Sequence, residues 1–331
     1  MNINDTVGID LSKLTFDARI HSSQIESEFE NNQKGFKKLV DWAFKNSETK
    51  KENIIFVFEH TGLYAHGLSV YLYSKDIPFH MVPGLEIKNS LGMIRGKDDK
   101  ADAKRIALYG FRMRDEITPT VLSSEEEQSI KRLLSLRQRL VKQRAGYKAS
   151  LKEQERVLNK KLNKTLLSTQ KRMIKCLSKE IEAVDQEMMQ VLEQNESMLR
   201  NYQLITSIKG VGKQTALFMV AYTANFTKFE NSRKFASYCG IAPFKNQSGT
   251  SIRGRTKVSN LANKKIKSLL DLCAKTSIQY NTEMRQFYQR RVEQGKNKMS
   301  TINIIRNKLV ARIFAVVNRN EPYVDTMKYT A

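Results

Sequence analysis

The fold is decided by a short apolar run near the start of the chain, Thr6-Val7-Gly8-Ile9-Asp10-Leu11, which contains one charged residue. Two further short segments follow after tight links, an alternating one at residues 16–21 and another at residues 24–29. Segments of this kind, separated by turn residues such as Ser22-Ser23, are typical of strands joined by hairpins. The start of the chain therefore predicts a three-stranded antiparallel meander.

Helices and strands then alternate. Residues 31–46 carry apolar side chains at helical spacing, residues 54–58 form an apolar strand that ends at Glu59, and residues 64–74 predict a second helix. A strand at residues 78–82 and a helix ending near residue 113 complete the region. The order of three strands, helix, strand, helix, strand, helix is the layout of the RNase H fold. There the first strand centres a mixed sheet, the fourth strand ends beside it, and the last helix packs across both.

Carboxylates stand at the points that this layout brings together. The stretch Gly96-Lys97-Asp98-Asp99-Lys100-Ala101-Asp102-Ala103 opens the last helix and places Asp99 and Asp102 on one face. Asp10 and Glu59 are carboxylates at apolar strands, where burial without a partner is costly. Each position also fits a solvated strand end or a charged helix start, because aspartate is favoured near helix N-termini. Together the four predict a Mg²⁺ or Mn²⁺ site, at which paired ions would polarise a phosphodiester.

The net charge of +23 lies entirely after residue 118 of the 331-residue chain, and most of it lies after residue 200. Residues 1–118 hold 17 basic and 17 acidic residues, residues 119–200 hold 17 and 11, and residues 201–331 hold 23 and 6. Such an excess indicates a polyanion partner, and nucleic acid fits better than a membrane surface. No apolar run is long enough to cross a membrane, and the polar N-terminus predicts no signal peptide. Three scattered cysteines favour a reducing, cytoplasmic compartment over a structural zinc site.

Residues 119–200 predict a helical arm. Ser123-Ser124-Glu125-Glu126-Glu127 is a helix-start pattern, and leucines then recur at three- and four-residue steps. A second such run covers residues 167–199. We expect two long helices in an antiparallel hairpin or coiled coil, serving as a spacer or as a dimer arm.

Residues 201–331 predict a mainly helical, basic domain. Gly210-Val211-Gly212-Lys213 indicates a helix–hairpin–helix, whose backbone N–H groups could hold a phosphate, although a tight turn between packed helices has the same pattern. A polar, glycine-punctuated loop at residues 244–257 contains Ser248, either a phosphate-gripping residue or a nucleophile that needs activation. Residues 261–317 predict three basic amphipathic helices. The candidate nucleic-acid contacts are Gly210, Gly212, Lys213, Lys245, Arg253, Arg255 and Lys257.

The chain resembles the DEDD-type insertion-sequence transposases, which are bridge-RNA-guided recombinases. The matching pieces span nearly the whole length: Gly8-Ile9-Asp10-Leu11-Ser12-Lys13, Glu59-x-Thr61-Gly62-x-Tyr64, Gly96-Lys97-x-Asp99-x-x-Asp102-Ala103, Ile208-x-Gly210-Val211-Gly212, residues 229–243 and Ser248-Gly249.

This resemblance implies a RuvC-like domain at residues 1–118, whose Asp10, Glu59, Asp99 and Asp102 hold Mg²⁺. It also implies a transposase domain at residues 201–331, whose serine, matched here by Ser248, attacks DNA and forms a transient phosphoserine link. The further implications are target and donor DNA, a structured bridge RNA, a dimer or tetramer, and a place at the prokaryotic nucleoid.

Two departures leave alternatives open. The family usually has Thr or Ser where Asp98 stands, so the metal ligand could be Asp98 or Asp99, and the three-residue spacing to Asp102 favours Asp99. The family often shows Ser-Lys-x-Gly downstream of the serine, where this chain has Ser259-Asn260-Leu261-Ala262, so Ser251 is a second candidate nucleophile. Two other functions also fit the pattern: a metal-dependent junction-resolving endonuclease without a covalent serine step, and a non-catalytic RNA-binding scaffold.

Overall fold

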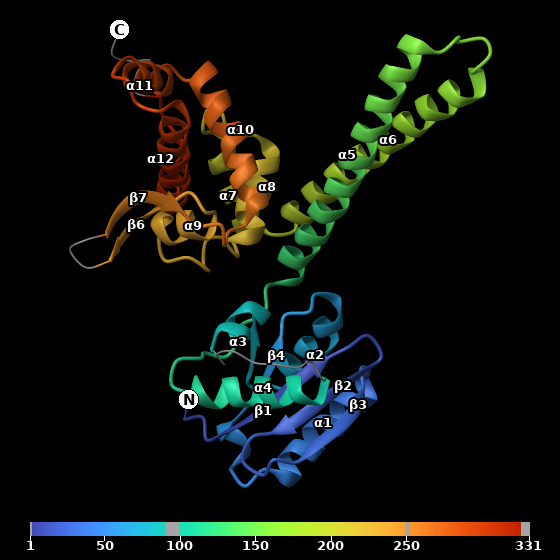
Figure 1. Cartoon of the computed structure of the whole chain (residues 1–331), viewed down its shortest axis with the longest axis vertical. Helices are drawn as coiled ribbons and strands as arrows, with labels where there is room; N and C mark the ends of the chain where they lie inside the picture. The colour runs from blue at the N-terminus through green and yellow to red at the C-terminus, as the bar shows by residue number, and fades with distance from the viewer. Residues whose placement is uncertain (1, 91–98, 249–251, 326–331) are drawn as a thin grey trace. The chain divides into compact units, whose positions relative to one another are not determined.

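The structure is a computed structural model and describes residues 2–90, 99–248 and 252–325 (Figure 1). The chain divides into two compact units, Met1–Leu122 and Ser123–Ala331. Asp98 and Ser251 lie outside the described residues. Within the described part, no helix has the length and apolar character needed to span a membrane.

The N-terminal unit is built on a five-stranded mixed sheet. Its strands are β1 (Asp5–Leu11), β2 (Thr15–Ile20), β3 (Glu26–Glu30), β4 (Ile54–Glu59) and β5 (Phe79–Val82), in the spatial order β3-β2-β1-β4-β5. The first three strands form an antiparallel meander, and β4 and β5 run parallel to β1. This arrangement confirms the predicted mixed α/β sheet with its first strand at the centre.

Helices cover both faces of this sheet. On one face, α1 (Gln33–Asn46) and α2 (Leu63–Ser74) pack on the inward side chains of β1, β2 and β4, such as Ile9, Phe16 and Phe58. On the other face, α4 (Asp99–Arg112) lies across β1 and β4, with α3 (Gly84–Ser90) beside it. A short 3-10 turn, η1 (Lys51–Asn53), precedes β4. The central strands are therefore buried on both faces, which explains their nearly continuous apolar sequence.

A buried carboxylate ties the N-terminal end of β1 to its surroundings. Asp5 is fully buried, and it accepts hydrogen bonds from the N–H groups of Thr6 (2.8 Å) and Ser22 (3.1 Å) and from the hydroxyls of Ser22 (2.5 Å) and Ser47 (2.6 Å). Buried charge of this kind is tolerated only when it is hydrogen-bonded. Asp5 therefore anchors β1 at the end of the strand opposite to Asp10.

The C-terminal unit is mostly helical. Its elements are α5 (Glu125–Val157), α6 (Lys164–Glu193), α7 (Glu196–Thr206), α8 (Lys213–Tyr222), α9 (Ser232–Tyr238), β6 (Pro243–Ser248), β7 (Ile252–Val258), α10 (Lys264–Tyr280), α11 (Thr282–Glu293) and α12 (Lys298–Arg319). The long helices α5 and α6 pair along their length (Figure 1) and are joined by an Arg137–Asp185 ion pair of 2.6 Å. Ser124 caps α5 as its sequence predicts, since its hydroxyl accepts from the N–H of Glu127 at 3.2 Å.

One hydrophobic core joins the first turns of α5 and the last turns of α6 to α7–α12. Ile130, Leu134, Met188 and Leu192 belong to the same buried cluster as Phe235 and Ile313. The base of the helical arm is thus part of the C-terminal unit. Division of residues 119–200 from residues 201–331 into separate domains stays a prediction, and so does a coiled-coil geometry for the arm.

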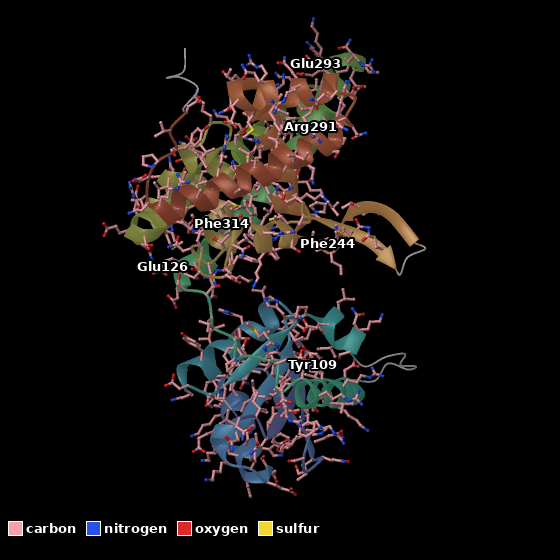
Figure 2. The ribbon with its side chains drawn as sticks, turned by 90° about the vertical axis from the view of Figure 1, so that its left-hand side faces the viewer. Tyr109, Glu126, Phe244, Arg291, Glu293 and Phe314 are labelled. Atoms are coloured by element: carbon pink, nitrogen blue, oxygen red, sulfur yellow. The ribbon has the colours of Figure 1, made fainter. Side chains whose placement is uncertain are left out.

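One local prediction is wrong. Residues 244–257 were expected to form a loop in a mainly helical region, but the structure has an antiparallel hairpin of β6 and β7, which bulges between Phe244 and Asn246. Figure 2 shows this hairpin extending from the helical core, with Phe244 near its base and Phe314 in the core. The polar, basic composition of residues 245–257 hides the strands because no apolar face alternates along them.

Candidate active site

Asp10 lies on the face of the sheet that α4 covers. Side chains alternate along a strand, so Asp10 shares its face with Gly8 and Thr6. The hydroxyl of Thr6 donates to the carbonyl of Ala107 in α4 at 2.8 Å, and a Cβ on Gly8 would lie 2.1 Å from the nitrogen of Ala107. Only glycine permits this approach of helix to strand. Since β1 runs from Thr6 to Asp10 against the direction of α4, Asp10 lies toward the first turns of the helix.

Glu59 lies on the same face, at the end of the neighbouring parallel strand. The pairing of Ile9 with Phe58 places Asp10 and Glu59 side by side at the carboxyl edge of the sheet. Val57, two residues before Glu59, belongs to the cluster that α4 covers. The carboxylate of Glu59 packs against Gly84, where an added Cβ would come within 2.2 Å of Oε1.

Helix α4 starts at this edge and supplies the remaining two candidates. Asp99 is its first residue, and Asp102 stands one turn later with an ion pair to Arg105 at 2.5 Å. The side chain of Asp99 lies outside the described part. At the far end of the helix, burial raises the pKa of Tyr109 well above its usual value, and the neutral phenol donates to Glu86 of α3 at 2.8 Å (Figure 2). This bond fixes α3 against α4.

The donors at this edge fit a hard divalent cation in kind, because all four are carboxylates. They stand on two adjacent strand ends and on the first turns of the helix packed over those strands, and their joint binding of one ion stays a prediction. In the part of the chain that the structure describes, no three metal-ligating side chains form a ready-made cluster. An ion bound through Oδ1 of Asp102 would have to displace Arg105 from that oxygen.

The strand register also places Asp17 at this edge, a residue that sequence reasoning missed. Asp17 of β2 stands directly opposite Asp10, and Glu28 of β3 stands opposite Asp17. Like charges at paired positions destabilise a sheet. Once residues 16–21 are assigned as a strand, the register of the first hairpin is the signal that could have found Asp17.

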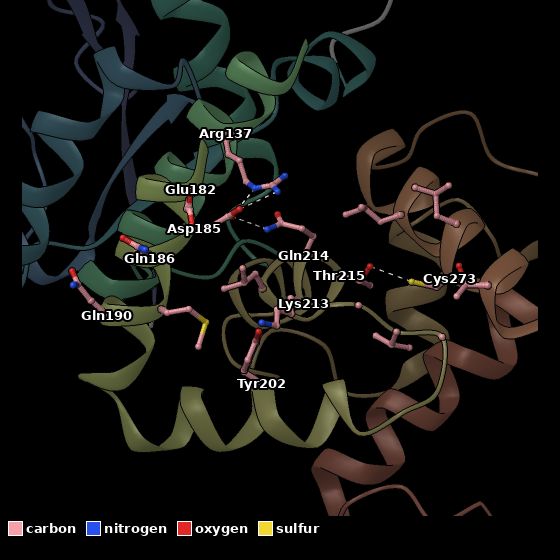
Figure 3. A pocket seen from close by; sticks show the side chains of 18 of the residues that line it. Arg137, Glu182, Asp185, Gln186, Gln190, Tyr202, Lys213, Gln214, Thr215 and Cys273 are labelled. Atoms are coloured by element: carbon pink, nitrogen blue, oxygen red, sulfur yellow. Dashed lines mark hydrogen bonds and ion pairs between the residues drawn. The ribbon is translucent and has the colours of Figure 1, made fainter. Parts of the chain in front are cut away.

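In the C-terminal unit, the predicted phosphate-binding turn lines a cavity of about 1010 Å³ (Figure 3). Gly210 has a φ of +91° and packs on Ser277, while Gly212 precedes the first turn of α8 without a side-chain cap. The thiol of Cys273 forms hydrogen bonds with the hydroxyl of Thr215 and with the backbone of Gly212.

The opposite wall of this cavity carries carboxylates and amides of α6. Asp185 is held by Arg137 and by Gln214, whose amide donates to it at 2.9 Å, and Glu182 lies on the same wall (Figure 3). Carboxylates on this wall oppose an anion in the cavity. The cations that line the cavity include Lys213 of the predicted motif and Arg137, which is paired with Asp185. Phosphate binding by Gly210, Gly212 and Lys213 stays a prediction.

Ser248 is the last residue of β6, paired in register with Ile252 near the tip of the hairpin. The start of the hairpin is anchored: the side-chain amides of Asn303 and Asn307 in α12 both donate to the carbonyl of Ile241, at 2.9 and 3.1 Å. Lys245 and Lys257 lie exposed along the hairpin. The side chains of Ser248, Arg253 and Arg255 lie outside the described part.

Comparisons with known proteins relate this chain to transposases and to pilin gene-inverting proteins. Residues 7–161 match a DEDD transposase of the IS110 type, and residues 202–289 match the transposase family IS116/IS110/IS902. The chain is 29% identical over 323 residues to the pilin gene-inverting protein of Moraxella bovis, a match that covers 96% of this chain and 97% of that protein. The same figures hold for the pilin gene-inverting protein of Moraxella lacunata. The transposase for insertion sequence element IS1111A of Coxiella burnetii is 26% identical over 259 residues, which cover 69% of this chain and 68% of that protein.

Proposed function

This chain belongs to the DEDD transposases of the IS110 type and so acts on DNA as a transposase. We propose that the carboxylates at the edge of the N-terminal sheet and the basic hairpin of β6 and β7 together cut and rejoin DNA strands. The observation that carries the proposal is the meeting of Asp10 and Glu59 on the face covered by the first turns of α4, which hold Asp99 and Asp102.

The family implies a divalent metal cation, and in this chain Asp10, Glu59, Asp99 and Asp102 would hold it as Mg²⁺. A cation held by these residues would supply charge neutralisation at the reacting phosphate. The residues of the chain supply position. Close packing at Gly8 sets the distance of α4 from β1, and Gly84 leaves the space that the Glu59 carboxylate occupies.

Ser248 is the proposed nucleophile. Its Oγ forms a bond to phosphorus while a bond from that phosphorus to a deoxyribose oxygen breaks. The hydroxyl proton leaves to a base, and the departing oxygen takes up a proton. A deoxyribose hydroxyl of the second strand then reverses the exchange and frees the serine. The phosphoester bond is conserved throughout, so joining needs no external energy source.

The remaining parts of the proposal concern partners. Of the 23 basic residues in residues 201–331, Lys245, Arg253, Arg255 and Lys257 lie on or beside the hairpin, so they would grip the phosphates of the strand that Ser248 attacks. A structured bridge RNA would select target and donor DNA, and a dimer or tetramer would bring two sets of carboxylates and serines to two strands.

The decisive experiment traps the covalent step with the full-length protein, its DNA and Mg²⁺. A protein–DNA adduct that survives denaturation is expected, lost in Ser248→Ala and kept in the matched control Ser251→Ala. Normal strand exchange by Ser248→Ala would refute the serine step. Cleavage without an adduct would favour the junction-resolving endonuclease.

The carboxylates are tested in parallel. Asp10→Asn and Asp102→Asn are expected to abolish cleavage while leaving DNA binding by the basic unit intact. Sequencing of RNA that copurifies with the protein tests the guide. A folded RNA encoded beside the gene is expected, and random cellular RNA would contradict this part of the proposal.

A further inference from the structure

Three large apolar side chains project into solvent at the carboxyl edge of the N-terminal sheet. Leu14, in the turn between β1 and β2, is 74% exposed; Leu63 and Tyr64, the first residues of α2, are 83% and 45% exposed. We call these three residues the apolar ledge. Leucine side chains are ordinarily buried, and apolar surface gathered at one place marks an interaction site more often than single exposed residues do.

The backbone beneath the ledge is held firmly by Asn31. Its side-chain amide donates to the carbonyl of Ser12 at 2.8 Å and to that of Tyr64 at 3.2 Å, so these two carbonyl oxygens are at most 6.0 Å apart. The backbone N–H of Asn31 donates to the carbonyl of Leu14 at 2.7 Å. Ser12 closes the turn, because its hydroxyl donates to the carbonyl of Thr15 at 2.6 Å. The ledge is therefore a fixed feature that joins the β1–β2 turn to the start of α2.

The ledge adjoins the carboxylates. Ser12 follows Asp10 by two residues, and Leu63 follows Glu59 by four, on strands that lie side by side. A DNA strand whose phosphate reaches Asp10 and Glu59 brings its neighbouring nucleotides close to the ledge, because successive phosphates of one strand of a duplex are only about 3.4 Å apart along the helix axis. The hydroxyl of Thr61, between Glu59 and the ledge, is buried without a hydrogen-bond partner among the described residues.

The chemistry of the ledge suits a base rather than a phosphate. Leu14, Leu63 and Tyr64 offer aliphatic and aromatic faces, and α2 has no Lys, Arg, Asp or Glu along its twelve residues. Proteins that distort DNA insert such apolar side chains between base steps, and aromatic faces stack on unpaired bases. Three side chains are too few for a stable contact between two copies of the chain, which needs roughly 800 Å² from each partner.

We propose that the apolar ledge receives a nucleobase that has left the DNA stack, next to the phosphodiester that lies at the carboxylates. The inference rests on the proposed function of those carboxylates. Seating an unstacked base there holds the strand open at the point of cleavage and fixes which phosphate reaches Asp10 and Glu59.

The test uses full-length protein and a short DNA duplex with one unpaired 5-iodouracil, which crosslinks to aromatic side chains on irradiation. A crosslink that peptide mapping places at Tyr64 is expected. The double variant Leu14→Ser/Leu63→Ser should lower its yield about fivefold or more, the effect of losing roughly 1 kcal/mol of base contact. The matched control is Val70→Ser/Tyr73→Ser, which changes two exposed side chains farther along the same helix.

Each outcome separates the ledge from the proposed catalytic function. A Tyr64 crosslink that the ledge variant loses supports base binding by the ledge, even if Ser248→Ala still exchanges strands. Absence of the Tyr64 crosslink, or equal crosslink yields in both double variants, refutes base binding by the ledge even if strand exchange proceeds as proposed. If light scattering shows that the ledge variant dissociates an oligomer, the surface is a protein contact and the inference is wrong.

Discussion

Replacing Gly8 with alanine is expected to separate helix α4 from the sheet. The added Cβ would lie 2.1 Å from the nitrogen of Ala107, 2.5 Å from the oxygen of Ala103 and 2.6 Å from Cα of Ala107. All three are backbone atoms, so no side chain can turn away. To restore ordinary contact, which begins near 3.4 Å, α4 must move by about 1 Å.

The magnitude follows from this geometry. Overpacking of a well-ordered core costs about 1–3 kcal/mol, and the 2.8 Å hydrogen bond from Thr6 to Ala107 contributes about 1 kcal/mol that the displacement would remove. We therefore expect Gly8→Ala to lower the free energy of unfolding of the N-terminal unit by about 2–4 kcal/mol. The displacement also moves Asp102 away from Asp10, so the Mg²⁺ concentration for half-maximal cleavage should rise.

The chain provides its own probe for this measurement. Trp42 is the single tryptophan and lies in α1, where its ring meets Phe29 edge-on at 5.4 Å. Urea unfolding followed by its fluorescence reports on the N-terminal unit. Gly146→Ala in α5 is the control, because its Cβ would meet nothing within 4 Å and it belongs to the other unit. A Gly8→Ala transition within about 0.5 kcal/mol of the unmodified protein would refute the close-packing argument.

The remaining predictions concern other buried or crowded groups. Asp5→Ala removes the acceptor of the hydrogen bonds donated by Thr6, Ser22 and Ser47, and it should lower the free energy of unfolding of the N-terminal unit by about 2–4 kcal/mol in the same urea assay. An unchanged urea midpoint would contradict this prediction. Gly84→Ala displaces only the end of the Glu59 side chain, so the rate of cleavage should fall at least tenfold while the free energy of unfolding stays nearly unchanged. A loss of stability that accompanies the loss of cleavage would instead show a general folding defect. In native protein at pH 8, alkylation followed by mass spectrometry should modify the exposed Cys176 and spare Cys239, because burial raises the pKa of the Cys239 thiol to about 12. For the same reason the unfolded chain, with a thiol pKa near 9.0, loses this proton first, so the contribution of Cys239 to stability is present below pH 9 and is lost as the pH rises toward 12; Cys239→Ala should flatten that loss.

Most of the N-terminal architecture could be predicted from the sequence because its signals are local. Apolar runs of strand length, helical periodicity and short turns are properties of neighbouring residues, and they placed β1, β4 and the helices α1 and α2. The candidate site followed from the element order, which brings Asp10, Glu59 and the start of α4 to one edge. The hairpin of β6 and β7 could not be predicted this way, because its strands pair through backbone hydrogen bonds and carry polar side chains.

By itself, the sequence determined the order of the elements, the location of the basic excess in residues 201–331 and the identity of the carboxylates. Tertiary structure alone decided which residues of different elements face one another. The register that sets Asp17 against Asp10, the approach of α4 that only Gly8 permits, and the bonds of Asn31 beneath Leu14 and Tyr64 all join residues distant in the chain. Periodicity describes which face a residue occupies, whereas the partner on that face depends on how whole elements dock, and their backbone contacts decide it.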